Sequence, residues 1–454
     1  MQGMTVIAGL GQTGWSVARF LAARGERFVV ADSRVEPPLL ERFREAFPDV
    51  PVHCGPFEDS QFIHADRLVL SPGIDTRQLP IRAAMANGVD VLGDVELFAR
   101  ALAESHDPRP VVAITGSNGK STVTTLVGAL LKALGHHPAV GGNLGTPVLD
   151  LLADQTADCF VLELSSFQLE TVRSLAPAVA TVLNVSEDHL DRYDSFEDYA
   201  VVKGKIAEHA GQFVFNRDDH CSRRIAKTLS VPTISFGFDV PEGEHLGFVE
   251  HSGTTWLAQG GRLLVPVTQL SMVGRHNYAN ALAALALIQA LGYQDLTNAD
   301  IIETLLTFEG LPHRCRRVAV IDEVTYIDDS KATNVGAALA AIDGISAPVV
   351  LIAGGEGKGQ DFSLLREPLA QKARGVVLIG RDAPLIASAL QPAVLTDYAL
   401  NMEAAVRQAA ALAKPGDVVL LAPACASFDM FDDYAHRGEC FTAAVRAMAE
   451  GRGA

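Results

Sequence analysis

The segment Thr115 to Thr122 constrains this chain more than any other. It reads Thr-Gly-Ser-Asn-Gly-Lys-Ser-Thr, follows the apolar run Val111 to Ile114, and precedes apolar residues at helical spacing. A glycine loop between a strand and a helix offers backbone N–H groups, a lysine and a hydroxyl to nucleotide phosphates. The loop is a variant, because Ile114 stands where the usual phosphate loop has its first glycine. We predict an ATP site, with a glycine-rich turn and an incidental lysine as the alternative.

Composition limits the class of protein. The chain has 454 residues and a net charge of -17, which disfavours a nucleic-acid surface. Six cysteines without paired spacing predict neither a zinc site nor disulfides and fit a reducing cytoplasm. The N-terminus lacks a basic leader, and the most apolar helix, Ala279 to Leu291, is shorter than the ~20 residues of a membrane span. We therefore expect a soluble cytoplasmic protein without nucleic-acid or membrane partners.

Strand-like and helical runs alternate in three successive parts of the chain. We place domains at residues 1–97, 98–310 and 311–454, each an α/β unit with a parallel sheet. The expected strands are Thr5–Ala8, Phe28–Ala31, Leu68–Leu70, Val111–Ile114, Cys159–Leu164, Val179–Asn184, Val324–Asp328, Val349–Ala353, Val376–Ile379 and Val418–Leu421. Open α/β sheets bind ligands beyond the carboxyl ends of their strands. The chemistry should therefore lie where those ends converge.

The first domain carries a dinucleotide fingerprint. Gly9-Leu-Gly11-Gln-Thr13-Gly14 follows a strand and opens a helix, and Asp32 ends the next strand. Taken alone, the pattern predicts NAD. Any nucleotide diphosphate can use the same helix N-terminus. A structural turn that binds no ligand is a further alternative.

Several polar residues of the central domain follow predicted strands. Glu163 can reach a magnesium ion, although Ser165 or Ser166 capping a helix explains its segment equally well. His189 lies among acidic residues in Glu187-Asp-His-Leu-Asp-Arg-Tyr, which hints at a metal or water-positioning role. Lys203 on a helix would ordinarily be a surface residue. Asn277 and Asn280 are suited to contacting a base, although capping of the following helix is the safer interpretation for Asn277.

The third domain places polar turns after three of its strands. These turns are Asp328 to Asn334, Gly354 to Gly359 and Cys425 to Asp429. Lysines and helix N-termini at the ends of one sheet suit an anionic ligand. Each segment taken separately can be an ordinary glycine or serine turn.

Together these segments resemble the Mur ligases over essentially the whole chain. The resemblance rests on the phosphate loop, Gly141-Gly-Asn143-Leu-Gly, Glu163-Leu-Ser-Ser-Phe-Gln-Leu-Glu, Glu187-Asp-His-Leu-Asp-Arg-Tyr, His313-Arg314, Asp329-Ser-Lys-Ala-Thr-Asn and Ala424-Cys-Ala-Ser427. Two of them, Ser-Ser-Phe-Gln-Leu-Glu and Ser-Lys-Ala-Thr-Asn, favour the glutamate-adding branch of the family. The resemblance implies that ATP activates the alanine carboxylate of UDP-N-acetylmuramoyl-L-alanine as an acyl phosphate, which D-glutamate attacks in peptidoglycan precursor synthesis.

The resemblance also implies a fold and a role for each domain. The first is a Rossmann-like domain for the uridine nucleotide, the central domain is ATPase-like with a phosphate loop, and the last is a Rossmann-like domain for the acceptor amino acid. The fingerprint would then bind UDP rather than NAD. The implied contacts to the UDP substrate are Gly11, Thr13, Gly14, Asp32, Ser33, Arg34, Ser71, Pro72, Gly73 and Asn143.

Further roles come from the same resemblance. ATP would contact Gly116, Ser117, Asn118, Gly119, Lys120, Ser121, Thr122, Asn277, Asn280, Arg314 and Asp329. Two magnesium ions would be held by Ser121, Glu163, His189 and Lys203, with Lys203 carbamylated by carbon dioxide. A carbamate turns a cation into an oxygen ligand, provided that the lysine can lose its proton. Lys120, His189, Lys203 and Lys331 would be the catalytic residues.

The implied acceptor contacts are Thr333, Lys358, Ser427 and Tyr434. Tyr434 is a departure, because the family has phenylalanine at the matching position. All implied partners are small molecules, and we expect a monomer.

Three other functions compete with this interpretation. A nicotinamide oxidoreductase fits the fingerprint but leaves the phosphate loop and Lys331 unexplained. A nucleotide switch without catalysis is disfavoured by the acceptor-like third domain. Folylpolyglutamate synthase shares the ATP machinery, but the uridine-site match argues against a folate substrate.

Overall fold

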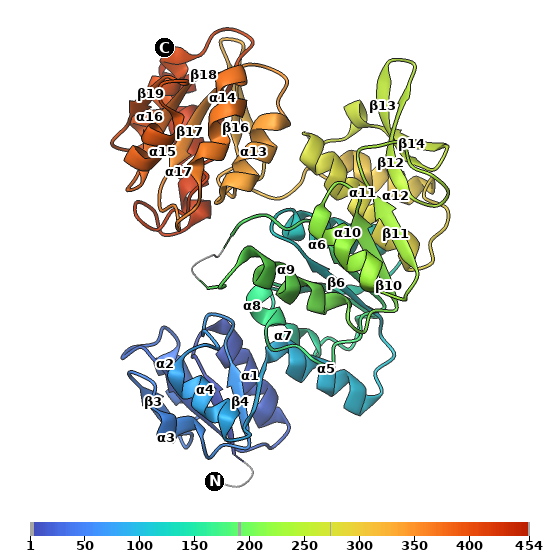
Figure 1. Cartoon of the computed structure of the whole chain (residues 1–454), viewed down its shortest axis with the longest axis vertical. Helices are drawn as coiled ribbons and strands as arrows, with labels where there is room; N and C mark the ends of the chain where they lie inside the picture. The colour runs from blue at the N-terminus through green and yellow to red at the C-terminus, as the bar shows by residue number, and fades with distance from the viewer. Residues whose placement is uncertain (1–3, 189–191, 273, 453–454) are drawn as a thin grey trace.

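The protein folds into three α/β units, as Figure 1 shows for the computed structural model. The structure describes residues 4–188, 192–272 and 274–452. Both outer units lie on the same side of the central unit in Figure 1, with the N-terminal unit in blue and the C-terminal unit in red. The predicted fold class and three-domain architecture are confirmed. Residue 97, where we expected the first domain to end, lies inside helix α5.

The N-terminal unit is a parallel sheet with strand order β3-β2-β1-β4-β5. Strand β1 pairs with both β2 and β4, so the strand order reverses beside β1 and opens a crevice at the carboxyl ends. Its elements are β1 (Thr5–Ala8), α1 (Gln12–Ala23), β2 (Phe28–Asp32), α2 (Leu40–Ala46), β3 (Val52–Cys54), α3 (Asp59–Phe62), β4 (Arg67–Leu70), α4 (Leu79–Ala86), β5 (Asp90–Gly93) and α5 (Asp94–Ser105).

The central unit has strand order β14-β13-β12-β11-β10-β9-β6-β8-β7. Strands β7 to β10 pair in parallel around β6, which carries the phosphate loop at its carboxyl end. Its elements are β6 (Val111–Thr115), α6 (Lys120–Ala133), β7 (Pro138–Gly142), α7 (Val148–Leu151), β8 (Cys159–Glu163), α8 (Ser166–Leu169), β9 (Val179–Val182), α9 (Phe196–Gly204), β10 (Gln212–Asn216), α10 (His220–Thr228), β11 (Thr233–Phe236), β12 (Leu246–His251), β13 (Thr254–Gln259), β14 (Arg262–Pro266), α11 (Arg275–Ala290) and α12 (Ala299–Thr307).

The C-terminal unit has strand order β15-β16-β20-β17-β18-β19. Strand β15 is antiparallel to β16, and the other pairs are parallel. Its elements are β15 (Arg316–Ile321), β16 (Val324–Asp328), α13 (Val335–Asp343), β17 (Val349–Gly354), α14 (Arg366–Lys372), β18 (Ala373–Ile379), α15 (Ala383–Leu390), β19 (Thr396–Tyr398), α16 (Met402–Leu412), β20 (Val418–Leu421) and α17 (Tyr434–Arg452).

The sheets contain elements that the sequence did not predict. Strands β12, β13 and β14 form an antiparallel meander on the central sheet, and β15 adds an antiparallel edge to the C-terminal sheet. Helix α11 begins at Arg275, earlier than the predicted Ala279, because Gly274 with φ +104° provides its N-cap.

Among the helices of the described residues, none has the length and apolar character needed to cross a membrane. All six cysteines are free thiols.

A buried arginine joins helix α17 to two strand ends of the C-terminal sheet. Arg437 is fully buried and donates hydrogen bonds to Ser330 Oγ at 2.9 Å, to the Ser330 carbonyl at 2.8 Å and to the Cys425 carbonyl at 3.0 Å. Burial lowers the pKa of Arg437 to about 10. Because Ser330 follows β16 and Cys425 follows β20, this side chain fixes the two loops relative to each other.

We predict that Arg437→Met destabilises the C-terminal unit. The substitution leaves two buried carbonyls unpaired at ~1–3 kcal/mol each, so the free energy of unfolding should fall by about 3 kcal/mol. Native-state hydrogen exchange of amides in β16 and β20 would measure this loss. The control is Arg446→Met on the exposed face of the same helix, for which we expect a change within about 0.5 kcal/mol. Equal protection in the two variants would contradict the role given to Arg437.

Candidate functional site

The phosphate loop has the predicted strand, loop and helix geometry. Strand β6 ends at Thr115, and α6 begins at Lys120 with Gly119 as its N-cap at φ +83°. A Cβ on Gly119 would lie 2.4 Å from Asn280 Oδ1, so both the backbone angle and the contact require glycine. The ammonium of Lys120 donates to the carbonyls of Gly116 at 2.8 Å and Ser117 at 3.0 Å. This lysine therefore lies folded over its own loop.

Two residues that we did not assign to the site hold the phosphate loop. The Asn184 side chain accepts a hydrogen bond from the Asn118 amide at 2.8 Å and donates to the Asn118 carbonyl at 3.0 Å. The buried hydroxyl of Tyr199 lies 3.1 Å from Ser117 Oγ. The sequence did contain a signal for Asn184, because this residue follows strand β9 beside the loop.

Lys203 lies under the phosphate loop rather than at the surface. Its side chain is 1% exposed, and Nζ donates to the Gly116 carbonyl at 2.9 Å. Burial lowers the pKa of Lys203 well below its ordinary value, and the neighbouring Lys120 ammonium lowers it further. The interpretation of Lys203 as a surface residue is wrong, and its amine is favoured in the neutral form.

Glu163 ends strand β8 beside these lysines. Its side chain is 2% exposed, and Oε1 accepts a hydrogen bond from Asn143 Nδ2 at 2.8 Å. Oε2 is buried without a hydrogen-bond partner among the described residues. Ser165 caps helix α8, as the alternative interpretation of this segment predicted, so the cap and the free carboxylate oxygen coexist.

The donor set around Glu163 fits magnesium. An unpaired, buried carboxylate oxygen is the kind of ligand that magnesium prefers, and the ion usually keeps waters and phosphate oxygens in its other positions. Within the described residues, no group of three or more His, Cys, Asp or Glu side chains gathers at one point. The expected ligand His189 and the neighbouring Asp191 lie outside the residues that the structure describes. Asp188 accepts a hydrogen bond from Asn334 Nδ2 at 3.3 Å, and Glu187 is exposed.

A cavity of about 310 Å³ extends from the phosphate loop between the central and C-terminal units. Arg314 Nη2 crosses from the C-terminal side and donates to Ser121 Oγ at 3.0 Å. Burial raises the pKa of Asp329 to about 6, against the opposing charge of Arg314. The predicted ATP contacts that line this cavity are Asn118, Gly119, Thr122, Asn277, Asn280, Arg314 and Asp329.

The interpretation of Asn277 as a helix cap is wrong. Gly274 is the N-cap of α11, so Asn277 lies within the first turn of the helix. Its Oδ1 accepts a hydrogen bond from Asn280 Nδ2 at 3.2 Å. The two asparagines therefore act as a pair on the wall of the cavity.

The three polar turns of the C-terminal sheet meet, as we expected. The Ala424 amide donates to the Ala332 carbonyl at 2.9 Å, which joins the loops of Lys331 and Ser427. Glu356 and Ala426 form a two-way backbone bridge, which brings the loop of Lys358 beside them. Thr333 follows Lys331 in the first of these loops, where its amide donates to the Lys331 carbonyl at 2.7 Å.

Lys331 and Tyr434 contact each other at this end of the sheet. The Lys331 ammonium lies 3.7 Å from the centre of the Tyr434 ring, a cation–π contact that phenylalanine can also make. Burial lowers the pKa of Lys331 to about 8, with further lowering by Arg314, Lys120 and Lys358 against the charge of Glu163.

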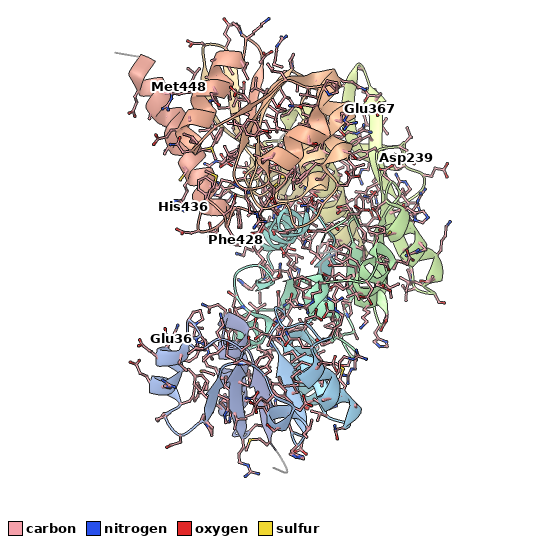
Figure 2. All side chains as sticks on the ribbon, turned by 60° about the vertical axis from the view of Figure 1, so that its left-hand side comes forward. Glu36, Asp239, Glu367, Phe428, His436 and Met448 are labelled. Carbon is pink, nitrogen blue, oxygen red and sulfur yellow. The ribbon has the colours of Figure 1, made fainter. Side chains whose placement is uncertain are left out.

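An aromatic side chain adjoins the buried Ser427. Phe428 is 69% exposed, whereas Ser427 is 2% exposed. Figure 2 shows Phe428 at the end of the C-terminal unit that is turned toward the other two units.

The fingerprint of the N-terminal unit forms a tight turn at the carboxyl end of β1. Gly11 is the N-cap of α1, and a Cβ on Gly14 would lie 1.9 Å from the Gly9 carbonyl oxygen. The Leu10 amide donates to Asp32 Oδ2 at 2.7 Å, and Arg34 pairs with the same carboxylate. Burial opposes the charge of Asp32, but these hydrogen bonds outweigh it and lower its pKa.

The other residues predicted to contact the UDP substrate surround this turn, with one exception. Ser71 Oγ donates to the Gly9 carbonyl at 3.1 Å, which places the turn after β4 beside the fingerprint. Asn143 lies apart from this group, in the central unit against Glu163. Thr13 lies in the first turn of α1, Ser33 and Arg34 follow β2, and Pro72 and Gly73 follow β4.

Three family profiles match consecutive parts of the chain. They are the MurD-like N-terminal domain of Mur ligases over residues 3–93, the Mur ligase middle domain over residues 114–288, and the glutamate ligase domain of Mur ligases over residues 313–425.

Two curated relatives are named UDP-N-acetylmuramoylalanine–D-glutamate ligase. The one from Methylobacillus flagellatus is 51% identical over 97% of this chain and 96% of its own length, and the one from Pseudomonas aeruginosa is 50% identical over 98% of each. Two solved structures from Thermotoga maritima share the fold at a TM-score of 0.60. UDP-N-acetylmuramate-alanine ligase is 20% identical, covering 98% of this chain and 99% of its own, and MurF ligase in complex with ADP is 18% identical, covering 99% and 95%. With identity near one half over almost its entire length, this chain belongs to the Mur ligase family.

Proposed function

We propose that this chain is an ATP-dependent ligase that joins D-glutamate to the alanine carboxyl group of UDP-N-acetylmuramoyl-L-alanine. The names of the relatives that are about half identical to it support this substrate pair. The reaction releases ADP and phosphate and belongs to peptidoglycan precursor synthesis. A monomer in the cytoplasm stays a prediction from the sequence.

One structural observation supports the proposal most directly. The partly buried Lys120 of α6 and the buried Lys203 of α9 donate to the same carbonyl of the phosphate loop, beside a carboxylate oxygen of Glu163 that has no partner in the described chain. The loop thus places a charged ammonium, a second amine that favours neutrality and an anionic ligand around one point. This arrangement suits a nucleotide phosphate with its metal.

Each unit supplies one reactant in this proposal. Residues 1–97 bind the UDP moiety at the fingerprint turn, residues 98–310 bind ATP, and residues 311–454 bind the acceptor. The acceptor contacts are Thr333, Lys358, Ser427 and Tyr434. Asn143 contacts the muramoyl part of the substrate from the central unit.

The chemistry proceeds in two steps. A carboxylate oxygen of the alanine attacks the terminal phosphorus of ATP, and ADP leaves. The glutamate amine then attacks the acyl carbon, phosphate leaves with its electron pair, and the nitrogen loses a proton. Lys120 and Lys331 stabilise the charge of the moving phosphoryl group by position and electrostatics.

Ser121, Glu163, His189 and a carbamylated Lys203 would hold the magnesium ions. The metal would neutralise phosphate charge during transfer. The neutral amine favoured at Lys203 supports the carbamate, because only the unprotonated nitrogen can attack carbon dioxide, losing one proton as the carbamate forms.

A first test removes the phosphate-loop lysine. We predict that Lys120→Ala lowers kcat for phosphate release by roughly 10²–10³-fold, because the charge of the transferred group loses its fixed cation. The assay combines ATP, UDP-N-acetylmuramoyl-L-alanine and D-glutamate, with L-glutamate and other amino acids as comparisons. Lys132→Ala, an exposed lysine on the same helix, is the control. Full turnover by the Lys120 variant would rule out the role assigned to Lys120.

A second test concerns the carbamate. We predict that Lys203→Ala loses activity and regains part of it in millimolar acetate or formate, because a small carboxylate can replace the carbamate oxygens. Lys120→Ala provides the matched variant that acetate should not restore. An active Lys203→Ala enzyme that ignores added carboxylate would refute the carbamate.

A third test follows the charge of Lys331. Because the pKa of this lysine is lowered to about 8, its cation is lost as the pH rises through that value, and kcat should fall on the basic side of about pH 8. In Lys331→Arg the guanidinium stays charged, so the basic limb of the pH profile should move upward even if the rate is reduced. If the basic limb of the pH profile is unchanged in Lys331→Arg, the limb reports the titration of a group other than Lys331.

A further inference from the structure

Two motif residues have no role in the proposed function. Glu170 ends the segment Glu163-Leu-Ser-Ser-Phe-Gln-Leu-Glu, and Arg192 lies near the end of Glu187-Asp-His-Leu-Asp-Arg-Tyr. Both lie in the central unit, but neither lies in the phosphate loop. The structure pairs them.

The pair is bidentate and largely buried. Arg192 Nε donates to Glu170 Oε1 at 2.9 Å, and Nη2 donates to Glu170 Oε2 at 2.8 Å. The arginine side chain is 9% exposed and the glutamate side chain 10%. The guanidinium also stacks on Phe167, 4.2 Å from its ring centre. Such a fork fixes direction as well as distance, which a surface ion pair does not.

The same pair reaches into the N-terminal unit. Arg192 Nη2 donates to the Ile74 carbonyl at 2.9 Å, and Thr76 Oγ1 donates to Glu170 Oε2 at 3.5 Å. Both contacts fall on the turn that follows β4. The Ile74 amide in turn donates to the Ser71 carbonyl at 2.9 Å, and Ser71 Oγ binds the Gly9 carbonyl of the fingerprint. A continuous chain of hydrogen bonds thus runs from Glu170 to the nucleotide turn.

The central unit strengthens the pair from its other side. Tyr193 Oη donates to Glu170 Oε1 at 2.9 Å, and Lys205 Nζ donates to the Glu170 carbonyl at 2.8 Å. Glu170 therefore collects donors from both units that meet at this seam. Its partners leave little freedom for the turn at residues 71–76 to move relative to the central sheet.

We propose that Arg192, oriented by Glu170, is a positioning residue that holds the turn at residues 71–76 against the central unit, so that the bound UDP substrate directs its carboxyl group toward ATP. The inference rests on the proposed function and deepens it by adding a determinant of substrate alignment. Arg192 contacts no reacting atom in this role. It acts through the Ile74 carbonyl on the turn that contains Ser71, Pro72 and Gly73.

A second arginine on the same seam provides a matched control. Arg77 Nη1 donates to Asp194 Oδ1 at 3.0 Å, so this pair also joins the two units. Its side chains are 44% and 84% exposed, and exposed pairs of this kind contribute little. Comparison of the two arginines separates a buried, directional contact from a simple bridge between the units.

The test compares Arg192→Lys with Arg77→Lys. Lysine keeps the positive charge beside Glu170 but cannot donate to both carboxylate oxygens and the Ile74 carbonyl in the fixed geometry of a guanidinium. We expect Arg192→Lys to raise the KM for UDP-N-acetylmuramoyl-L-alanine by about tenfold and to lower kcat, with the Kd for ATP within about twofold of wild type. For Arg77→Lys, we expect changes within about twofold in all three quantities.

Each outcome decides the proposal. Wild-type values in Arg192→Lys, or a Kd for ATP that rises in step with the KM, would overturn it, because the pair would then be dispensable or merely structural. If Arg192→Lys does not fold, the near-isosteric Glu170→Gln replaces it with the same expected split. Failure of both variants to fold would also assign the pair a purely structural role and overturn the proposal.

Calorimetric titration of the UDP substrate without ATP separates this inference from the proposed function. A wild-type chain that binds the UDP substrate but releases no phosphate would contradict the ligase reaction alone. Wild-type turnover together with unchanged substrate affinity and KM in Arg192→Lys would contradict the positioning role alone.

Discussion

The Gly116 carbonyl is the point at which the phosphate loop joins helices α6 and α9. It accepts hydrogen bonds from both Lys120 and Lys203, in a region closed to solvent at Lys203. Two ammonium groups at such a point repel each other, and burial adds a penalty for each charge. Lys203 is the more enclosed of the two side chains, so burial favours the neutral form there, whereas Lys120 is only partly buried. The loop conformation, set by the positive φ angles of Gly116 and Gly119, therefore creates two chemically different lysines.

The candidate site is assembled from sheets that are far apart in the sequence. Its geometry therefore depends on contacts that hold the units in place relative to one another. Arg314 reaches Ser121 across the nucleotide cavity, and Asn334 reaches Asn118 and Asp188. At the junction with the N-terminal unit, Arg192 reaches Ile74. The buried apolar clusters of the central and C-terminal units are separate, whereas one apolar cluster continues from the N-terminal unit into the central unit. Arg437 has the corresponding role inside the C-terminal unit, where it holds together the loops that follow β16 and β20.

Much of this arrangement could be predicted because its signals are local. The glycine loop from Thr115 to Thr122 needs only its neighbouring strand and helix, and the structure has both. The contacts that complete the site are not local: Asn184 holds Asn118 from 66 residues away, and Arg192 finds Glu170 over 22 residues. The antiparallel strands β12 to β14 were not predicted, because alternation of strands and helices indicates parallel units and carries no signal for a meander. The cap assigned to Asn277 was wrong because Gly274, with its positive φ, begins the helix earlier.

The net charge of the chain does not predict the local charge of its site. A net charge of -17 predicts repulsion of anions on average, yet cations gather at the site: besides burial, Arg314 lowers the pKa of Lys120 and Lys331, and Lys120 and Lys358 lower the pKa of Lys331 further. Their mutual repulsion costs stability in the empty site, and bound phosphates and carboxylates would relieve it. Burial and neighbouring cations lower the pKa of both Lys203 and Lys331, which favours loss of a proton and so limits this cost. A cluster of cations on an acidic protein thus favours the binding of compact anions. The acidic surface repels extended polyanions, whereas the hydrogen-bond donors of the cavity lie close together and can all reach a small anion.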